Sequence, residues 1–197
     1  MVSAQLHLTK SPGPNGMSAL FFQKYWSIVG THVSNMALNV LNFGMTLFEI
    51  NRTNIVLVPK TNNPQRMIDF RPISLCNTIY KIVTKILVNQ LKHLMPTLVS
   101  SSQTAFVLGR RGTDNVITAQ ELVYTIEQKK GKEGFMIIKI DLEKAYDRLE
   151  WSFVRSMLVS LGFHSDTVEL ILSCISTTSV ALLFNGDQIG KFVLPVA

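Results

Sequence analysis

An acidic residue at the end of an apolar segment is the feature of this sequence with the clearest potential for chemistry. Residues 135–142 (Phe-Met-Ile-Ile-Lys-Ile-Asp-Leu) predict a β-strand. Because side chains alternate along a strand, the even-numbered residues from Met136 to Leu142 are expected to face the core, and Asp141 is expected to face away from it. A carboxylate held rigidly there is a suitable ligand for a divalent cation, and phosphoryl transfer commonly uses two such cations about 4 Å apart. The alternative is that Asp141 only ends the strand and caps the next turn, which is the more common situation for an isolated aspartate.

Cations around a second predicted strand form another candidate site. Asn54 to Pro59 is rich in β-branched residues and predicts a short buried strand, which a polar loop from Lys60 to Arg71 follows. Lys60, Arg66 and Arg71 place positive charge on this loop, where a forked guanidinium group can hold a triphosphate or template phosphates. The alternative is an ordinary solvated loop, which the residue types by themselves favour.

The elements that must position these residues are helices and strands in irregular order. Helices are expected over Ser18 to Val29, His32 to Leu41, Asn77 to Met95, Thr113 or Asp114 to Lys130, Ser152 to Leu161 and Asp166 to Ser176. Further strands are expected over Ser179 to Phe184 and Ile189 to Val193, joined by a turn at Asn185-Gly186. Gly30 and Pro96 are expected to end helices, and Asp166 with Glu169 has the spacing of a capping box. This mixture predicts an α+β fold.

Composition limits the class of protein. The 197 residues are 47% hydrophobic and 16% charged, which is typical of a globular chain, and the net charge of +6 favours a polyanionic partner. Cys76 and Cys174 are far apart and outside any Cys-x-x-Cys pattern, which argues against a disulfide framework or a thiolate zinc site. Without an apolar run of spanning length or a secretory signal, the chain is expected to be intracellular, either nuclear or cytoplasmic, and not secreted or bound to a membrane.

The sequence around Asp141 resembles the first carboxylate motif of reverse transcriptase palms. In Asp141-Leu-Glu-Lys-Ala-Tyr146-Asp147 an aromatic residue follows the aspartate by five positions, in the form found in non-LTR (LINE-type) elements, especially those of plants. The resemblance implies that Asp141 binds Mg²⁺, with the Leu142 carbonyl as a further bridge to the triphosphate, and that the Tyr146 ring excludes a 2′-hydroxyl. Asp147 is expected to start a helix and is not included among the metal ligands. Trp151 and Phe153 are expected in the core.

Upstream segments resemble other motifs of the same family, in the same order. Residues 69–83, with Phe-Arg-Pro-Ile-Ser-Leu, resemble the fingers motif, and residues 102–110, ending in Gly-Arg110, resemble the next motif, although Leu108 stands where proline is usual. Residues 11–16 resemble a Pro-Gly-Pro-Asp-Gly signature, with Asn15 replacing the acidic residue. The resemblance covers essentially residues 10–195.

The family resemblance implies a fold, an activity and partners. Residues 10–134 would form the fingers and connecting helices, and residues 135–197 the start of a palm. The implied partners are an RNA template, a DNA primer and deoxynucleoside triphosphates, and the cations that would contact phosphates are Lys60, Arg66, Arg71 and Arg110. The expected function is that of a fragment of an RNA-directed DNA polymerase that uses two-metal nucleotidyl transfer.

The motifs that carry the other catalytic aspartates of the family do not occur in these residues. The sequence contains no Ala-Asp-Asp or Gly-Asp-Pro string, and Gly186-Asp187 belongs to the predicted hairpin. With Asp141 as the single metal-binding carboxylate, the chain is expected to be inactive alone and to leave part of the palm sheet uncovered. The alternative function is a noncatalytic nucleic-acid-binding remnant of a retroelement. A basic interaction domain unrelated to polymerases is the third possibility.

Overall fold

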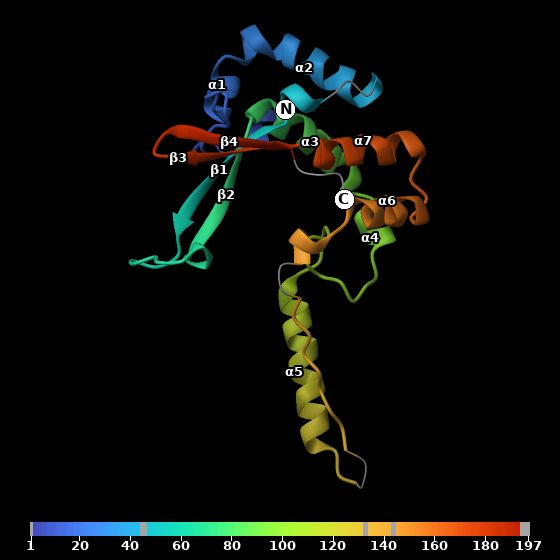
Figure 1. The fold of residues 1–197 in the computed structure, drawn as a ribbon. Coiled ribbons are helices and arrows are strands. Elements are labelled where there is room, and N and C mark those ends of the chain that lie inside the picture. Colours follow the sequence, from blue (N-terminus) through green and yellow to red (C-terminus); the bar gives the residue numbers. More distant parts are fainter. Residues whose placement is uncertain (1, 44–46, 132–133, 143–144, 194–197) are drawn as a thin grey trace. The chain divides into compact units, whose positions relative to one another are not determined.

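The chain folds into two compact units. The computed structural model describes residues 2–43, 47–131, 134–142 and 145–193. One unit, called unit 1, comprises Met1–Leu87 and Glu150–Ala197, and the other, unit 2, comprises Val88–Leu149 (Figure 1). These boundaries differ from the division expected near residue 134, and the assignment of segments to fingers and palm stays a prediction.

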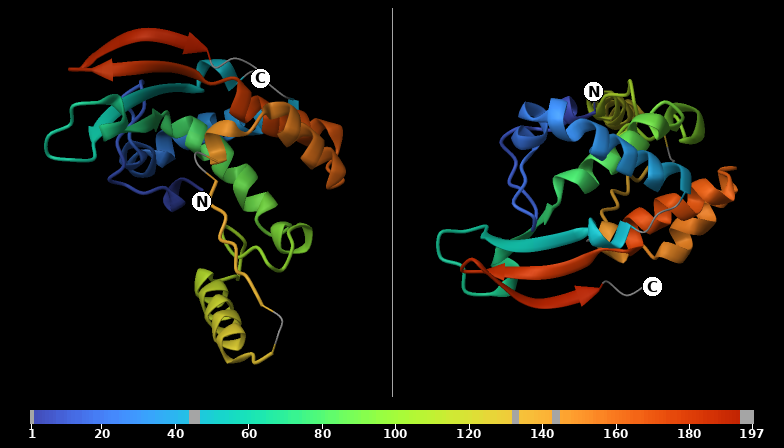
Figure 2. Two further views of the ribbon diagram at one scale, coloured as in Figure 1. Left: turned by 60° about the horizontal axis from the view of Figure 1, so that its bottom comes forward. Right: turned by 90° about the horizontal axis from the view of Figure 1, so that it is seen from above.

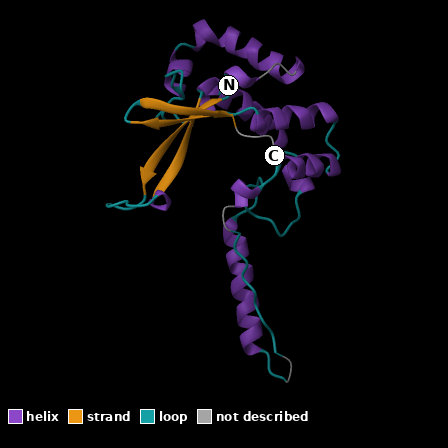
Figure 3. Cartoon of the chain, viewed as in Figure 1, coloured by secondary structure: helices purple, strands orange, loops and turns teal. Residues whose placement is uncertain are grey.

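Unit 1 contains every strand that the described residues form (Figure 3). The strands are β1 (Arg52–Pro59), β2 (Phe70–Cys76), β3 (Ser179–Phe184) and β4 (Asp187–Val193). They form one sheet in the order β2-β1-β3-β4, in which β1 and β3 are parallel and the other two pairs are antiparallel hairpins. Two hairpins that are far apart in the sequence are therefore joined through their central strands. The mixed sheet and its helices confirm the predicted α+β class.

The β3–β4 hairpin matches the prediction, whereas β2 was missed. Asn185 and Gly186 connect the hairpin with φ of 51° and 94°, the left-handed values that a two-residue primed turn requires. The sequence analysis placed residues 70 and 71 in a loop and assigned no strand before the following helix. Pro72 explains why no strand was predicted for β2, since proline has no amide hydrogen to donate to a ladder. It is tolerated because β2 is an edge strand.

The core of unit 1 forms between helices. Its helices are α1 (Ala19–Lys24), α2 (Trp26–Phe43), α3 (Thr78–Leu91), α6 (Trp151–Ser160) and α7 (Ser165–Ser176), with short 3₁₀ turns at Ser3–Gln5, Leu47–Glu49 and Met67–Asp69. Figure 2 shows α1, α2 and α3 together on one side of the sheet. Apolar residues recur at helical spacing along α3, and Ile82, Val83 and Leu87 near its centre are buried in two clusters with residues of α1, α2 and α7.

Two predicted helix ends are wrong. Gly30 does not stop a helix but lies inside α2, and the break comes earlier, at Tyr25. A Cβ atom at Gly30 would lie 2.7 Å from the indole of Trp26, so the glycine leaves room for that ring. Pro96 does not end α3, which stops at Leu91; it lies in the first turn of the short helix α4 (Met95–Leu98), where a missing amide hydrogen costs nothing.

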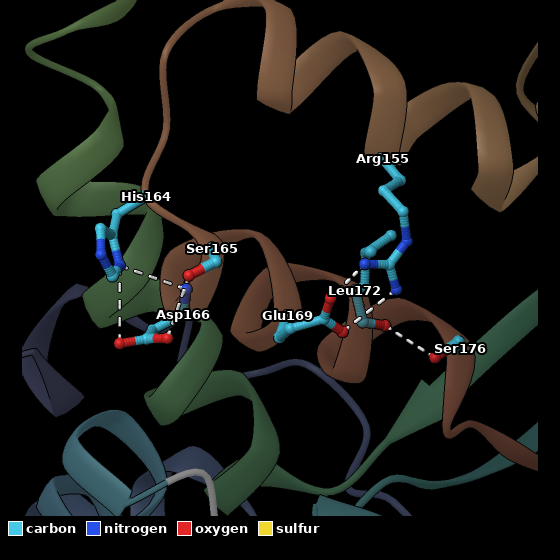
Figure 4. A network of polar contacts seen from close by, with 7 residues as sticks. All are labelled: Arg155, His164, Ser165, Asp166, Glu169, Leu172 and Ser176. Carbon is cyan, nitrogen blue, oxygen red and sulfur yellow. Dashed lines mark hydrogen bonds and ion pairs between the residues drawn. The ribbon is translucent and has the colours of Figure 1, made fainter.

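The start of α7 also differs from the expected capping box. His164 is the N-cap, and its Nδ1 accepts from the Asp166 amide at 3.4 Å. Glu169 instead pairs with Arg155 of α6, with an Nη2–Oε2 distance of 3.1 Å and a second hydrogen bond from Nη1 to Oε1 (Figure 4). This hydrogen bond raises the pKa of Arg155 and lowers that of Glu169. Phe153 of α6 was expected in the core and is 53% exposed.

Unit 2 contains a long helix and an extended segment. The helix α5 (Gly112–Gln128) begins close to the predicted start, and a 3₁₀ turn, η4, spans Ala145–Arg148. The strand predicted for residues 135–142 is wrong, because none of these residues forms a ladder with another described residue. Its expected core face, Met136 to Leu142, is 67% to 80% exposed at the even positions. Alternating apolar residues favour a strand, but a partner strand decides whether one forms.

Candidate functional site

The tip of the β1–β2 hairpin holds the first of the predicted cations. Lys60 follows the last residue of β1, and its backbone amide donates to the Asp69 carbonyl at 2.8 Å. Its ammonium group, at the exposed surface, donates to the carbonyl of Ile68 at 2.7 Å. An ammonium has three donors, so this contact leaves capacity for an anion. The backbone hydrogen bond closes the hairpin and holds the position from which the Lys60 side chain extends.

Asp69 organises the loop that carries Arg66. Its carboxylate accepts from the backbone amides of Gln65 and Arg66 at 3.1 and 2.9 Å. The Arg66 guanidinium lies 3.8 Å from the same carboxylate, with 78% of its side chain exposed. Such an exposed pair contributes little to stability, which leaves the guanidinium able to exchange partners. This role of Asp69 was not predicted from the sequence.

Arg71 lies on β2, on the same hairpin. It pairs with Val58 of β1 in the antiparallel register, and its side chain is exposed. The hairpin therefore brings Lys60, Arg66 and Arg71 onto one projecting element. All three residues are exposed, so these charges stay in water, where polyanion binding depends strongly on salt.

Unit 2 carries the predicted carboxylate. Asp141 lies in the extended segment with an exposed side chain, next to Leu142, and Tyr146 of η4 is 75% exposed. Residues 143 and 144 and the side chain of Asp147 lie outside the described part of the chain. Among the residues that are described, no three His, Cys, Asp or Glu side chains are grouped closely enough to hold a metal ion. An exposed carboxylate is compatible with one oxygen-preferring cation, but a two-metal site needs more ligands than this.

Arg110, also in unit 2, contacts backbone instead of projecting from its loop. Its Nη2 donates to the carbonyls of Pro96 and Val99 at 3.1 and 3.0 Å, and its Nη1 donates to those of Ser100 and Gln103. These four hydrogen bonds fold the segment after α4 around one guanidinium. The contact of Arg110 with nucleotide stays a prediction, and in this structure the side chain has a structural role.

The two groups of candidate residues belong to different units. Lys60, Arg66 and Arg71 lie in unit 1, whereas Arg110, Asp141, Leu142 and Tyr146 lie in unit 2. The structure therefore describes the geometry of each group by itself.

A network of buried polar groups in unit 1 was missed by the sequence analysis. Asn51, 1% exposed, donates from Nδ2 to the Cys174 carbonyl at 3.0 Å and to Thr177 Oγ1 at 3.1 Å, and its Oδ1 accepts from Thr178 at 3.3 Å. Its backbone carbonyl accepts from the Ser179 amide at 3.0 Å. The side chain thus fastens the start of β1 to the connection between α7 and β3. The available signal was an asparagine three residues before the strand predicted from Asn54.

A second asparagine fastens the glycine- and proline-rich loop near the start of the chain. Asn77 donates from Nδ2 to the Ile50 carbonyl at 3.0 Å, and its Oδ1 accepts from the Asn15 amide at 3.2 Å. Thr78 donates to the Met17 carbonyl at 2.6 Å. A Cβ atom at Gly13 would lie 2.4 Å from the backbone nitrogen of Asn77, so only glycine allows this approach.

Cys174 lies in a buried part of unit 1. Burial raises the pKa of the Cys174 thiol to about 11, which leaves it protonated at neutral pH. The Tyr80 hydroxyl donates to the Cys174 carbonyl at 2.7 Å, and burial raises its pKa well above its usual value. In the described residues both cysteines are free thiols.

Comparison with known proteins identifies the family. Residues 58–194 match the family model described as reverse transcriptase (RNA-dependent DNA polymerase). The chain is similar to the transposon TX1 uncharacterized 149 kDa protein of Xenopus laevis, with 29% identity over 78% of this chain and 12% of that protein. It is also similar to the retrovirus-related Pol polyprotein from type-2 retrotransposable element R2DM of Drosophila melanogaster, with 27% identity over 97% of this chain and 17% of that protein.

The chain belongs to the reverse transcriptase family, because the family model covers more than half of its residues. Both relatives are named as proteins of mobile elements, one a transposon and the other a type-2 retrotransposable element, and with the family match they confirm the predicted LINE-type resemblance. The chain spans less than a fifth of the length of either relative. Within the described residues, no helix is both long and apolar enough to cross a membrane.

Proposed function

We propose that this chain contributes nucleic-acid and nucleotide contacts to an RNA-directed DNA polymerase of a LINE-type element. The observation that carries the proposal is the extent of the family match, since residues 58–194 include both the cationic hairpin and the segment from Asp141 to Tyr146. The exposure of both groups supports the proposal, because neither is occupied by packing within its own unit.

The hairpin cations are proposed to bind phosphates. The Lys60 ammonium contacts one carbonyl and the Arg66 guanidinium one carboxylate, both on the same loop, and a stronger phosphate contact can replace them. Arg71 adds a guanidinium on the neighbouring strand. The ligands would be the RNA template, the DNA primer or the triphosphate of an incoming deoxynucleotide.

Asp141 and its neighbours are proposed to serve the metal and the sugar. The Asp141 carboxylate and the Leu142 carbonyl are oxygen donors of the type that Mg²⁺ prefers, and an exposed site suits an ion that keeps several of its waters. The bound ion would supply charge neutralisation for phosphoryl transfer. Tyr146 would lie against the sugar and discriminate against a 2′-hydroxyl by steric collision. Because one carboxylate does not complete a two-metal site, activity requires further ligands from the parent protein.

A binding assay tests the proposal on the full chain. Fluorescence anisotropy with a labelled RNA–DNA primer–template is expected to show salt-dependent binding, which the triple variant Lys60→Gln, Arg66→Gln, Arg71→Gln weakens strongly. The exposed Lys24 of α1 provides a control, because Lys24→Gln removes the same kind of charge away from the hairpin. Binding by the triple variant that equals wild type would refute the proposed role of the hairpin.

The alternative function is that of a noncatalytic nucleic-acid-binding remnant. The absence of a group of three metal-binding side chains among the described residues favours it. The two functions differ at Asp141, since only the polymerase role needs a metal there. Mn²⁺-induced broadening of the NMR signals of residues around Asp141, lost in Asp141→Asn, would support the polymerase role, and its absence in wild type would support the remnant.

The site of action in the cell is a proposal as well. The cationic hairpin and the family match support an intracellular role with RNA and DNA, in the nucleus or the cytoplasm.

A further inference from the structure

A polar cavity lies at the junction of the two hairpins of unit 1, away from the β1–β2 tip. Its volume is about 290 Å³. Its lining residues come from the loop at the start of the chain and from three strands: Pro14, Arg52, Thr53, Asn54, Ser179, Ala181, Gln188 and Lys191. Among the described residues, this lining contains two cations and no carboxylate. A cavity with this charge favours an anion.

Strand register places the two cations on the same face of the sheet. Arg52 is level with Ser179 in the parallel pair, and Lys191 is level with Ala181 in the antiparallel pair. Because Ser179 and Ala181 are two residues apart on β3, their side chains lie on the same face of the sheet. Their partners across the ladders, Arg52 and Lys191, therefore lie on that face as well. The two cations belong to β1 and β4, which lie on either side of β3. The axes of these two strands are about 10 Å apart, which is twice the spacing of neighbouring strands. Long side chains can converge on one ligand from that separation.

A β-bulge is what brings Lys191 to this face. Ala181 pairs with Lys191, but Leu182 pairs with Ile189, so Gly190 is an extra residue without a partner across the ladder. Its φ of 62° is the left-handed value that glycine adopts at low cost. Without this extra residue, Gln188 and Lys191 would point to opposite faces.

A small residue forms the middle of the cavity. Ala181 on β3 is short enough that Gln188 of β4 reaches over it and donates to Asn54 Oδ1 of β1 at 3.1 Å. This amide pair fixes polar groups beside the two cations. Asp187, the acid nearest to Lys191 in the sequence, is level with Phe184 on the opposite face of the sheet, so it does not line the cavity.

The loop at the start of the chain forms one wall of the cavity. Pro14 is held there because its neighbours are anchored, Gly13 by close approach to the Asn77 backbone and Asn15 by its hydrogen bond to the Asn77 side chain. The cavity is therefore a built feature of unit 1, with a fixed wall, a fixed floor and two exposed cations at its edge.

We propose that this cavity binds a phosphate group through Arg52 and Lys191, at a site separate from the cations of the hairpin tip and from Asp141. The Arg52 guanidinium offers two parallel donors to phosphate oxygens, and the Lys191 ammonium contributes a point charge. The amide groups of Asn54 and Gln188 lie beside these donors. The phosphate is either a free anion or a phosphate of a nucleic-acid backbone. This inference does not depend on polymerase function.

Isothermal titration of the full chain with inorganic phosphate at constant ionic strength tests the proposal. Arg52→Gln and Lys191→Gln are each expected to weaken binding about tenfold, the effect of losing one charge-assisted hydrogen bond. Lys24→Gln should change it less than about twofold, as expected for a distant exposed charge. Ala181→Val fills the cavity without changing charge and should also weaken binding, with thermal unfolding used to confirm that the variant folds.

The outcomes distinguish the site and the source of the phosphate. Competition of inorganic phosphate with a labelled single-stranded RNA, together with a salt slope lowered by about 0.7 in Arg52→Gln, supports a backbone phosphate. Unchanged RNA binding in variants that lose inorganic phosphate supports a free phosphate. The proposal is overturned if Arg52→Gln and Lys191→Gln behave like Lys24→Gln, or if a folded Ala181→Val binds phosphate as wild type does.

Discussion

Replacing Asn51 by alanine tests whether buried polar contacts hold the sheet of unit 1 together. Asn51 is 1% exposed, and its side chain makes three hydrogen bonds across the connection between α7 and β3. A buried hydrogen bond contributes about 1 kcal/mol net, so the three together predict a loss of about 3 kcal/mol. The former partners limit the loss, because the Cys174 carbonyl keeps its bond from Tyr80 and Thr177 keeps its bond to Ser173.

The expected loss is measurable by two methods. Urea unfolding followed by circular dichroism should give a free energy of unfolding lower by about 2 to 3 kcal/mol. The melting temperature should fall by about 4 to 12 °C, given about 2 to 4 °C per kcal/mol for a chain of this size. Asn39→Ala, at an exposed position of α2, is the matched control and should change stability by less than about 0.5 kcal/mol.

A second variant separates hydrogen bonding from packing. Asn51→Asp keeps the side-chain volume and the acceptor oxygen for Thr178, but it loses both Nδ2 donors and buries a charge. It should therefore destabilise at least as much as Asn51→Ala. A loss below about 1 kcal/mol in both variants would refute the reasoning that these contacts fasten β1 to β3.

Three further predictions concern charge, catalysis and pH. Lys60→Gln and Arg71→Gln should each lower the slope of log affinity against log salt for single-stranded RNA by about 0.7, measured by anisotropy; an unchanged slope would mean that these cations do not contact phosphates. The chain should not extend a primer on an RNA template with Mg²⁺, and Asp141→Asn should leave its stability within about 0.5 kcal/mol because the side chain is exposed; extension that Asp141→Asn abolishes would contradict this. Burial raises the pKa of Cys174 from 9.0 to about 11, so its contribution to stability is complete below pH 9 and is lost as the pH rises to about 11. A Cys174→Ala variant should lack that loss in urea titrations, and an identical pH profile would disprove it.

The sequence predicted well where local rules agree with the packing. The β3–β4 hairpin was predicted from Asn185-Gly186 because a primed turn demands left-handed residues that few other dipeptides supply. The helix α3 was predicted because its apolar residues recur at helical spacing over several turns. The family was recognised from ordered motifs, since long specific strings such as Phe-Arg-Pro-Ile-Ser-Leu carry more information than any single element.

The errors occurred where a distant partner decides the structure. Residues 135–142 have the alternation of a strand, yet no described residue pairs with them. Gly30 has the local character of a helix stop but continues α2, because the Trp26 ring takes the space that a side chain would need. Glu169 has capping-box spacing but pairs with Arg155 of the preceding helix.

By itself, the sequence determined the class of fold, the family, and the candidate residues Asp141, Tyr146 and the hairpin cations. These depend on side-chain chemistry and local periodicity, which follow directly from the order of residues. Only the tertiary structure decided which groups share a surface. Arg52 and Lys191 are far apart in the chain. They lie on one face of the sheet because β1 and β3 are parallel neighbours and a bulge at Gly190 shifts the register of β4. Such contacts depend on strand pairing over long separations, which no local pattern encodes.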